Sequence, residues 1–239
     1  MMAGLNNAVQ QQRDWSTRVS QCSQPSTTED CLCGLFCCPC AFATAKSNVD
    51  KSSACYDILC WNPIAIRNYV RHEYGIPGVC GDDIGYTLFC PFCVGRQVIT
   101  ESKLRGLSMQ AYAPMYGANT SNWNKSLFDC DFCNCVSAMM CPCCMAADIR
   151  AMLQPSAAQD GCINHCCIAP TAMYGQVRNH YGIVSDVGFC EDVLLALVCY
   201  PCAIIRAKKE ASYRIQQQQQ PQVVQGAAVQ LAQMFGGRR

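Results

Sequence analysis

Cysteine constrains the organisation of this chain more than any other residue. It occupies 23 of 239 positions, and 20 of the 23 fall into ten pairs whose members lie 102 to 110 residues apart. The pairs are Cys22/Cys130, Cys31/Cys133, Cys33/Cys135, Cys38/Cys141, Cys40/Cys143, Cys55/Cys162, Cys60/Cys167, Cys80/Cys190, Cys90/Cys199 and Cys93/Cys202. Cys37, Cys144 and Cys166 have no partner in this register. Such a period predicts one Cys-rich unit written twice in tandem.

Other residues repeat in the same register and set the predicted domain boundaries. The clearest are Trp15/Trp123, Tyr74/Tyr181 and Asp83/Asp192. We predict a polar tail (1–14), a first Cys-rich module (15–105), a linker (106–122), a second module (123–214) and a Gln-rich tail (215–239). The last tail has little to bury, so we expect it to be disordered.

The charge and the amino terminus limit the compartment and the partners. The formal charge is +1 with 15% charged residues, so no broad basic face predicts nucleic acid as a partner. The first 20 residues lack the apolar core of a secretory signal, which predicts the reducing cytosol. There, closely spaced thiols indicate metal ligation or lipid attachment more often than a disulfide scaffold.

Local signals predict a mainly α fold with irregular Cys-rich segments. Asn62-Pro63 and Gly75 have the composition of a helix start and stop, and Ala169-Pro170 and Gly182 repeat them without the Asn cap. A later helix is expected from near Asp83 to Arg105, and from near Asp192 to Arg214. Pro91 and Pro201 predict a kink in it.

Charged residues recur every four positions in that later helix. The ladders are Cys93, Gln97, Glu101, Arg105 and Cys202, Arg206, Glu210, Arg214. We interpret the Glu–Arg steps as helix-stabilising pairs, worth about 0.3 to 0.5 kcal/mol each if exposed. Gln97 and Arg206 occupy equivalent positions in the two ladders. If either lined an interface between the modules, this difference would indicate that the two modules contribute different surfaces to the contact. Asp83 and Asp192 are interpreted as helix N-caps.

Four apolar stretches are long enough to touch a bilayer but short for crossing it. They are 31–45, 84–95, 132–147 and 193–205, holding 15, 12, 16 and 13 residues, where a spanning helix needs about 20. Length alone favours buried core over a hairpin or interfacial segment that enters one leaflet.

A set of motifs resembles the placenta-specific-eight family, which includes onzin, cornifelin and the plant cell-number-regulator and cadmium-resistance proteins. In the second module these are Trp123-x3-Leu-Phe-Asp-Cys130, Cys141-Pro-Cys143, Arg178-x2-Tyr-Gly-Ile183, Asp192 and the ladder from Cys199 to Arg214. The first module matches through Cys37-Cys-Pro-Cys40, Arg71-x2-Tyr-Gly-Ile76, Asp83 and the ladder from Cys90 to Arg105. The first module lacks the Leu-Phe-Asp run, and both lack the glycine usual after Cys-Pro-Cys.

The resemblance implies membrane association, roles in cell growth and heavy-metal handling, without a settled enzymatic activity. Because this family usually has one such domain per chain, a tandem suggests an internal pseudo-dimer.

Paired thiols make zinc the first candidate cofactor. Zinc takes four ligands in a tetrahedron, and Cys-x-Cys or Cys-x2-Cys pairs supply two each. Our hypothesis joins the Cys-Pro-Cys pair of each module to its Cys-x2-Cys pair, giving two ligand sets. They are Cys38, Cys40, Cys90 and Cys93, and Cys141, Cys143, Cys199 and Cys202. Buried cysteine can also act only as a small hydrophobic residue.

Three other readings of polar residues and thiols remain open. Cys90-Pro-Phe-Cys93 looks like a glutaredoxin-type site, but the alternation of strand and helix that such sites use is missing, so redox catalysis is disfavoured. S-acylation of Cys37, Cys38 and Cys40, or of Cys141, Cys143 and Cys144, would compete with metal. The histidines are interpreted as surface residues, with His165 alone worth testing as a ligand.

We therefore expect a non-enzymatic protein on the cytosolic side of a membrane, such as the plasma membrane, that binds zinc or a similar soft metal in metal homeostasis or growth control. Its expected partners are membrane lipid and either further copies of itself or other proteins. The alternatives are an oligomeric divalent-metal transporter or pore, and a soluble cytoplasmic growth-regulating adaptor with structural metal.

Overall fold

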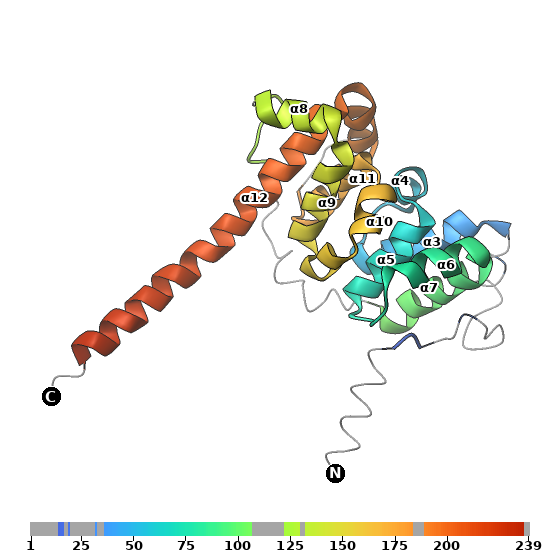
Figure 1. The fold of residues 1–239 in the computed structure, drawn as a ribbon, viewed down its shortest axis with the longest axis horizontal. Helices are drawn as coiled ribbons and strands as arrows, with labels where there is room; N and C mark the ends of the chain where they lie inside the picture. The colour runs from blue at the N-terminus through green and yellow to red at the C-terminus, as the bar shows by residue number, and fades with distance from the viewer. Residues whose placement is uncertain are drawn as a thin grey trace, which may run out of the picture.

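The protein is mainly α-helical, as predicted (Figure 1). The structure, a computed structural model, describes residues 14–16, 19, 32, 36–106, 122–129, 132–183 and 189–236. Within these ranges there is no strand, and Trp61 and Ile168 form an isolated antiparallel bridge. Most of the predicted linker and amino-terminal tail, and Cys22, Cys31, Cys33 and Cys130, lie outside the described residues.

The helices follow one another in the same order in two halves of the chain. We call residues 14–106 the N-terminal half and residues 122–236 the C-terminal half. The N-terminal half contains α3 (Cys38–Asp50), α4 (Ala54–Cys60), α5 (Pro63–Glu73), α6 (Cys80–Phe89) and α7 (Pro91–Arg105). The C-terminal half contains α8 (Phe132–Met140), α9 (Pro142–Leu153), the 3-10 helix η2 (Pro155–Gln159), α10 (Gly161–Cys166), α11 (Pro170–His180) and α12 (Phe189–Gly236).

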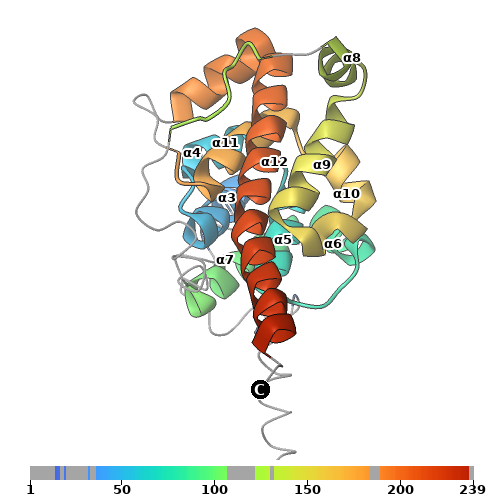
Figure 2. The same ribbon diagram turned by 90° about the vertical axis from the view of Figure 1, so that its left-hand side faces the viewer.

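One hydrophobic core runs through both halves. Helix α3 packs on α7 as α9 packs on α12, and α4 and α5 meet α10 and α11 between the halves. Phe42, Val98, Ile149 and Met173 are all buried in this core. The halves therefore lie side by side as one packed body (Figures 1 and 2).

The predicted start and stop signals of the central helices are confirmed. Asn62 caps α5 because its side-chain oxygen accepts a hydrogen bond from the Ile64 backbone N–H at 2.8 Å. Gly75 and Gly182 follow the last turns of α5 and α11 with φ of +61° and +58°, a left-handed conformation that favours glycine. The same local chemistry thus bounds both helices.

The expected kinks in the later helices lie at cysteine rather than at proline. Cys90 separates α6 from α7, and Cys199 is the non-helical residue inside α12. The prolines stand in the first turn after each break, where a missing N–H costs nothing. Beyond Arg214, where we expected disorder, α12 continues to Gly236 and extends past the other helices (Figure 1). Gln, Ala and Met are good helix formers, whereas our expectation weighed only what the segment could bury.

Candidate functional site

Four helix starts share a Cys-x2-Cys pair, and these pairs form the candidate functional site. The pairs, at disulfide distance with Cα atoms 5.2 to 5.5 Å apart, are Cys37/Cys40, Cys90/Cys93, Cys141/Cys144 and Cys199/Cys202. This separation is normal for a disulfide. The sequence had favoured metal or lipid over disulfides for these thiols.

The backbone is nearly identical at the first cysteine of every pair. Its φ lies between −141° and −147° and its ψ between 65° and 71° at all four positions. The second cysteine lies in the first turn of the helix that follows. Each pair therefore closes a break between two helical segments, at the positive end of the second helix dipole.

This geometry corrects the predicted cysteine register. Cys37 corresponds to Cys141 and Cys40 to Cys144, whereas the sequence paired Cys38 with Cys141 and left Cys37 and Cys144 unmatched. The error arose because the proline moves by one position between the two pairs, so that aligning Cys-Pro-Cys shifts the register by one residue.

The cysteines of the α9 start form the group that could hold a metal ion within the described ranges. The ligand atoms of Cys141, Cys143 and Cys144 all lie within 4.8 Å of one another, and the Cys141 and Cys143 sulfur atoms are 3.4 Å apart. Tetrahedral zinc with about 2.3 Å bonds separates its sulfur ligands by about 3.8 Å. Cys141 and Cys143 are thus spaced nearly as two zinc ligands are, whereas the Cys141/Cys144 pair would have to open before both of its thiols could bind the ion.

The equivalent segment of the N-terminal half is arranged differently. Cys38 donates a hydrogen bond to the Pro91 carbonyl oxygen at 3.2 Å, and a Cβ added to Gly95 would lie 3.5 Å from the Cys38 sulfur. The α3 start therefore lies against the α7 start, as our hypothesis required. The two four-cysteine ligand sets stay a prediction, because neither is gathered as a set in this geometry.

The cysteines outside the four pairs divide by environment. Cys55, Cys133, Cys162 and Cys166 are exposed. Burial raises the pKa of the Cys60 and Cys167 thiols, so both hold their protons more tightly than a free cysteine does. His165, the histidine singled out for testing, donates a hydrogen bond from its Nδ1 to the Gly161 carbonyl oxygen of its own helix, 2.7 Å away.

A large exposed apolar side chain directly precedes the first cysteine of every pair. Phe36, Phe89, Met140 and Val198 have 81%, 92%, 81% and 83% of their surface exposed. The side chains after the breaks, such as Phe42 and Ile204, are buried instead. Each apolar stretch is therefore exposed before the cysteine pair and part of the core after it.

No single described helix is long and apolar enough to cross a membrane. The bent pair Phe132–Met140 and Pro142–Leu153, with 105° between its helices, has the required length and composition.

Each half has a tryptophan–arginine stack beside its second cysteine pair, Cys90/Cys93 or Cys199/Cys202. The arginine of the stack comes from a different helix in each half. The Arg67 guanidinium lies 4.6 Å from the Trp15 ring and donates to Gln97 Oε1 at 2.7 Å. In the C-terminal half, Arg206 lies 4.4 Å from Trp123 and donates to the Tyr174 hydroxyl at 2.9 Å. Gln97 and Arg206 thus differ because the stacking arginine lies in α5 in the N-terminal half and in α12 in the C-terminal half. The difference does not reflect a contact between the halves.

The repeated Glu–Arg steps anchor the tryptophan segments. Glu101 and Glu210 are fully buried, so the surface interpretation was wrong. Glu101 accepts hydrogen bonds from the Ser16 backbone and hydroxyl at 2.8 and 2.9 Å, while Glu210 accepts from the Asn124 backbone at 2.9 Å. The arginine one turn later in each helix pairs with the same glutamate.

Asp83 and Asp192 are ion-pair acceptors and not N-caps. The N-cap of α6 is Val79, and Asp83 is buried in its first turn, 3.1 Å from Arg67 and 2.8 Å from Arg71. Arg178 contacts Asp192 in the same way at 2.8 Å. Burial of the carboxylates depends on packing against the preceding helix, which no capping pattern reveals.

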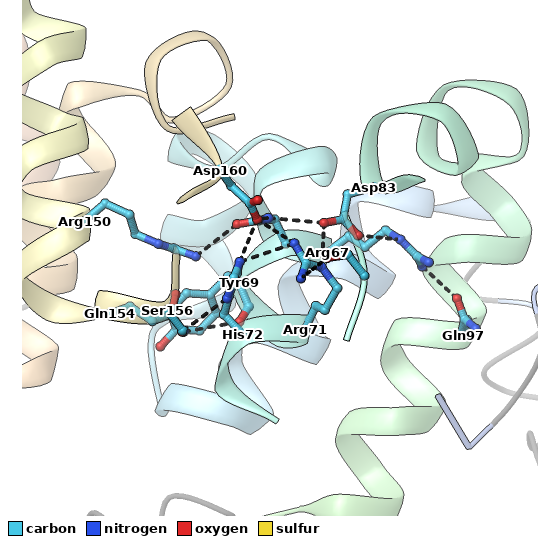
Figure 3. A network of polar contacts seen from close by, with 12 residues as sticks. Arg67, Tyr69, Arg71, His72, Asp83, Gln97, Arg150, Gln154, Ser156 and Asp160 are labelled. Atoms are coloured by element: carbon cyan, nitrogen blue, oxygen red, sulfur yellow. Dashed lines mark hydrogen bonds and ion pairs between the residues drawn. The ribbon is translucent and has the colours of Figure 1, made fainter. Parts of the chain in front are cut away.

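A polar network joins the halves around Asp160 (Figure 3). Its carboxylate accepts hydrogen bonds from Asn68 at 2.6 Å, from Arg71 at 2.5 Å and from the His72 ring at 2.6 Å. Burial raises the pKa of Asp160, but the bonds from His72 and Asn68 outweigh it and the pKa is lowered. Sequence reasoning missed this residue, since Asp160 has no repeated counterpart, and it had placed His72 on the surface.

The comparison with protein families matches the C-terminal half. The family model described as "PLAC8 family" covers residues 123–210. The human "Placenta-specific gene 8 protein" is 38% identical over 88 residues, 37% of this chain and 70% of that protein. The mouse protein of that name is 39% identical over 83 residues, 35% and 68% of the two chains, and the zebrafish (Danio rerio) "Cornifelin homolog" is 33% identical over 95 residues, 38% and 80%. No solved structure matches. This chain belongs to the PLAC8 family.

Proposed function

We propose that this protein is a membrane-associated, non-enzymatic metal-binding protein whose site is the cysteine cluster at the start of α9. The supporting observation is the convergence of Cys141, Cys143 and Cys144 within 4.8 Å. Three thiolates favour zinc or a similarly thiophilic divalent ion. In the reduced protein the Cys141/Cys144 pair would open and supply two of these ligands.

The fourth ligand would come from the break in α12. Helix α9 packs against α12 as α3 packs against α7, where Cys38 reaches the Pro91 carbonyl of the facing helix start. By this correspondence Cys199 or Cys202 would complete a tetrahedron with the α9 thiols. Cys38, Cys40, Cys90 and Cys93 stay the predicted ligands of a second site in the N-terminal half.

Zinc counting on the full-length protein, purified under reducing conditions, tests the site. We expect about one zinc for the α9 cluster, its loss on replacement of Cys143 by serine, and a lower unfolding temperature after chelation. Cys162→Ser is the control, because Cys162 is an exposed cysteine that belongs to neither predicted ligand set. Equal zinc in wild type and Cys143→Ser would reject the cluster.

For the membrane contact, we propose that the exposed residues before the four pairs enter one leaflet from the cytosolic side of the plasma membrane. Phe36, Phe89, Met140 and Val198 are each more than four-fifths exposed, so contact with acyl chains would remove their apolar surface from water. A formal charge of +1 makes a purely electrostatic anchor unsuitable.

Flotation with vesicles of neutral phospholipid measures this contact. We expect binding that survives high salt and falls when Phe36 and Phe89 are both changed to serine. Leu104→Ser is the control, since Leu104 is 54% exposed at the far end of α7, away from any cysteine pair. Binding that disappears in high salt, or that Leu104→Ser weakens equally, would contradict insertion.

We further propose that residues 15–105 are a second copy of the PLAC8 domain. Support comes from the common helix order, the four equal cysteine conformations and the buried glutamates. Trp61 and Ile168, at equivalent positions by the register of Cys60 and Cys167, form an antiparallel bridge with each other. Equivalent residues meet in this way across a two-fold axis, as in an internal dimer.

The bent α8–α9 pair is the feature that favours the alternative of an oligomeric metal pathway. It would place the α9 thiols inside a bilayer. Zinc uptake into sealed vesicles containing the protein separates the two functions: uptake abolished by Cys143→Ser supports a pathway, and binding without uptake supports the metal-binding role.

A further inference from the structure

The Cys90/Cys93 pair lines a cavity on the opposite half of the protein from the α9 cluster. The cavity has a volume of about 730 Å³, and its wall includes Trp15, Arg67, Asp82, Cys90, Cys93 and Gln97. Small-molecule sites usually have volumes of about 300 to 1,000 Å³. A cysteine pair in such a wall is open to a small thiol, because both cysteines are only partly buried.

The helix start suits thiol exchange at this pair. Cys90 is the N-cap residue of α7, which is 15 residues long, and Cys93 lies in its first turn. The partial positive charge of a helix N-terminus stabilises a thiolate there. A stabilised thiolate is the better leaving group when a disulfide is attacked.

The cavity wall has groups of both charges at separate places. Asp14 and Asp82 are exposed carboxylates, while the Arg67 guanidinium is held deeper between Trp15 and Asp83. Tyr86 adds a half-exposed ring 5.6 Å from Arg67. An ammonium group would meet the carboxylates, and an amide or carboxylate group would meet Gln97 and Arg67.

We propose that Cys90 and Cys93 form a redox-active site for a low-molecular-weight peptide thiol and its disulfide, of the size and zwitterionic character of glutathione. This site goes beyond the metal-binding role and uses none of the α9 cysteines. It shares Cys90 and Cys93 with the predicted second metal site, so the exchange belongs to the metal-free protein.

The exchange balances with two thiol molecules. The first, as thiolate, attacks the Cys90 sulfur, forming a mixed disulfide while the Cys90–Cys93 bond breaks and Cys93 leaves as a thiolate that takes up the proton. A second thiolate attacks the small-molecule sulfur of the mixed disulfide, releases Cys90 as a thiol and leaves the small disulfide. The pair thus gains two electrons and two protons, and the small disulfide reoxidises it by the reverse steps.

The C-terminal half supplies an internal control. Cys199 has nearly the same backbone conformation as Cys90, but the stack beside the Cys199/Cys202 pair has Tyr174 and Arg206 where the cavity has Arg67 and Gln97. If the helix N-terminus alone set the reactivity, the two pairs would exchange with a small thiol at the same rate. A binding site at the cavity would make the Cys90/Cys93 pair react faster.

The test uses full-length, reduced and metal-free Cys93→Ser and Cys202→Ser proteins with oxidised glutathione, and measures the adducts by intact mass and peptide mapping. We expect the adduct on Cys90 to form about tenfold faster than that on Cys199. Adding Asp82→Asn should slow the Cys90 reaction with oxidised glutathione but not with the disulfide of 2-mercaptoethanol, which has no ammonium group.

Wild-type protein provides a second measurement that needs no folding of a variant. Glutathione should reduce Cys90/Cys93 faster than 2-mercaptoethanol does at equal thiolate concentration, and the Cys199/Cys202 pair should show no such preference. Equal rates at both pairs, or no preference for the peptide thiol, would overturn the proposal. Both measurements use metal-free protein and follow only the reactions of sulfur, so failure of the metal site is distinguishable.

Discussion

Moving the arginine of the Trp15 stack from position 67 to position 97 tests whether the arrangement of the C-terminal half can replace that of the N-terminal half. We consider Arg67→Tyr and Gln97→Arg, singly and together. The double variant reproduces the C-terminal arrangement, in which Arg206 stacks on Trp123 at 4.4 Å and donates to Tyr174 at 2.9 Å.

The two single changes should both destabilise the fold. Arg67→Tyr removes the stack on Trp15 and leaves Gln97, which is 97% buried, without the hydrogen bond from Arg67; together these cost about 2 to 4 kcal/mol. Asp83 keeps its contact with Arg71 at 2.8 Å. Gln97→Arg places a second guanidinium beside Arg67 in a buried site, at a cost of about 3 kcal/mol or more.

The double variant should lose less than about 2 kcal/mol, giving a coupling energy of at least about 3 kcal/mol between the two positions. Urea unfolding followed by far-UV circular dichroism, under reducing conditions, measures all four proteins. Additive losses would refute the reasoning, because they would mean that the stack and its hydrogen bond do not act as one unit.

Further expectations concern the joint between the halves, acid stability and the buried glutamates. Gly175→Ala should destabilise by about 2 kcal/mol or more, because the added Cβ would lie 2.5 Å from the Tyr56 ring; Gly85→Ala, with nothing within 4 Å, is the control and should be neutral or stabilising in thermal melts. Burial lowers the pKa of His180 from 6.5 to about 4, so the unfolded chain binds this proton first, and about 3 kcal/mol of stability present above pH 6.5 should be lost as the pH falls to 4. His180→Gln should reduce that slope in urea titrations at several pH values, and an unchanged slope would contradict the assignment. Glu210→Ala should cost about 3 kcal/mol or more and shift Trp123 fluorescence to the red, since the Asn124 and Lys125 backbone N–H groups lose their acceptor; unchanged emission would argue against the anchor.

Signals confined to a few adjacent residues were sufficient to predict much of the fold. Asn62-Pro63 and Gly75 bound a helix through their own caps and dihedral angles, so no distant contact was needed to place it. The shared break before the last helix was also predictable, because proline near Cys90 and Cys199 excludes a continuous helix.

Features that depend on packing between distant segments could not be predicted in this way. The burial of Glu101 requires the chain around Ser16 to lie across α7, 85 residues away in sequence. Asp160 acquires its role only because α5 of the other half faces it. The predicted correspondence of the cysteines was wrong for a related reason. Cys37/Cys40 and Cys141/Cys144 correspond because each pair lies at disulfide distance across a helix break, whereas the prediction aligned the prolines between them.

The exposed residue before each cysteine pair gives the thiols a defined depth once the protein is docked. If Phe36, Phe89, Met140 and Val198 enter acyl chains, the next residue in each case, a cysteine, stands at the boundary between lipid and water. Water-soluble thiols and metal chelators would then reach the pairs from one side only. Attachment to the bilayer would thus limit which reagents reach the cysteines, simply because of where the cysteines lie. Release into solution would expose all four pairs together.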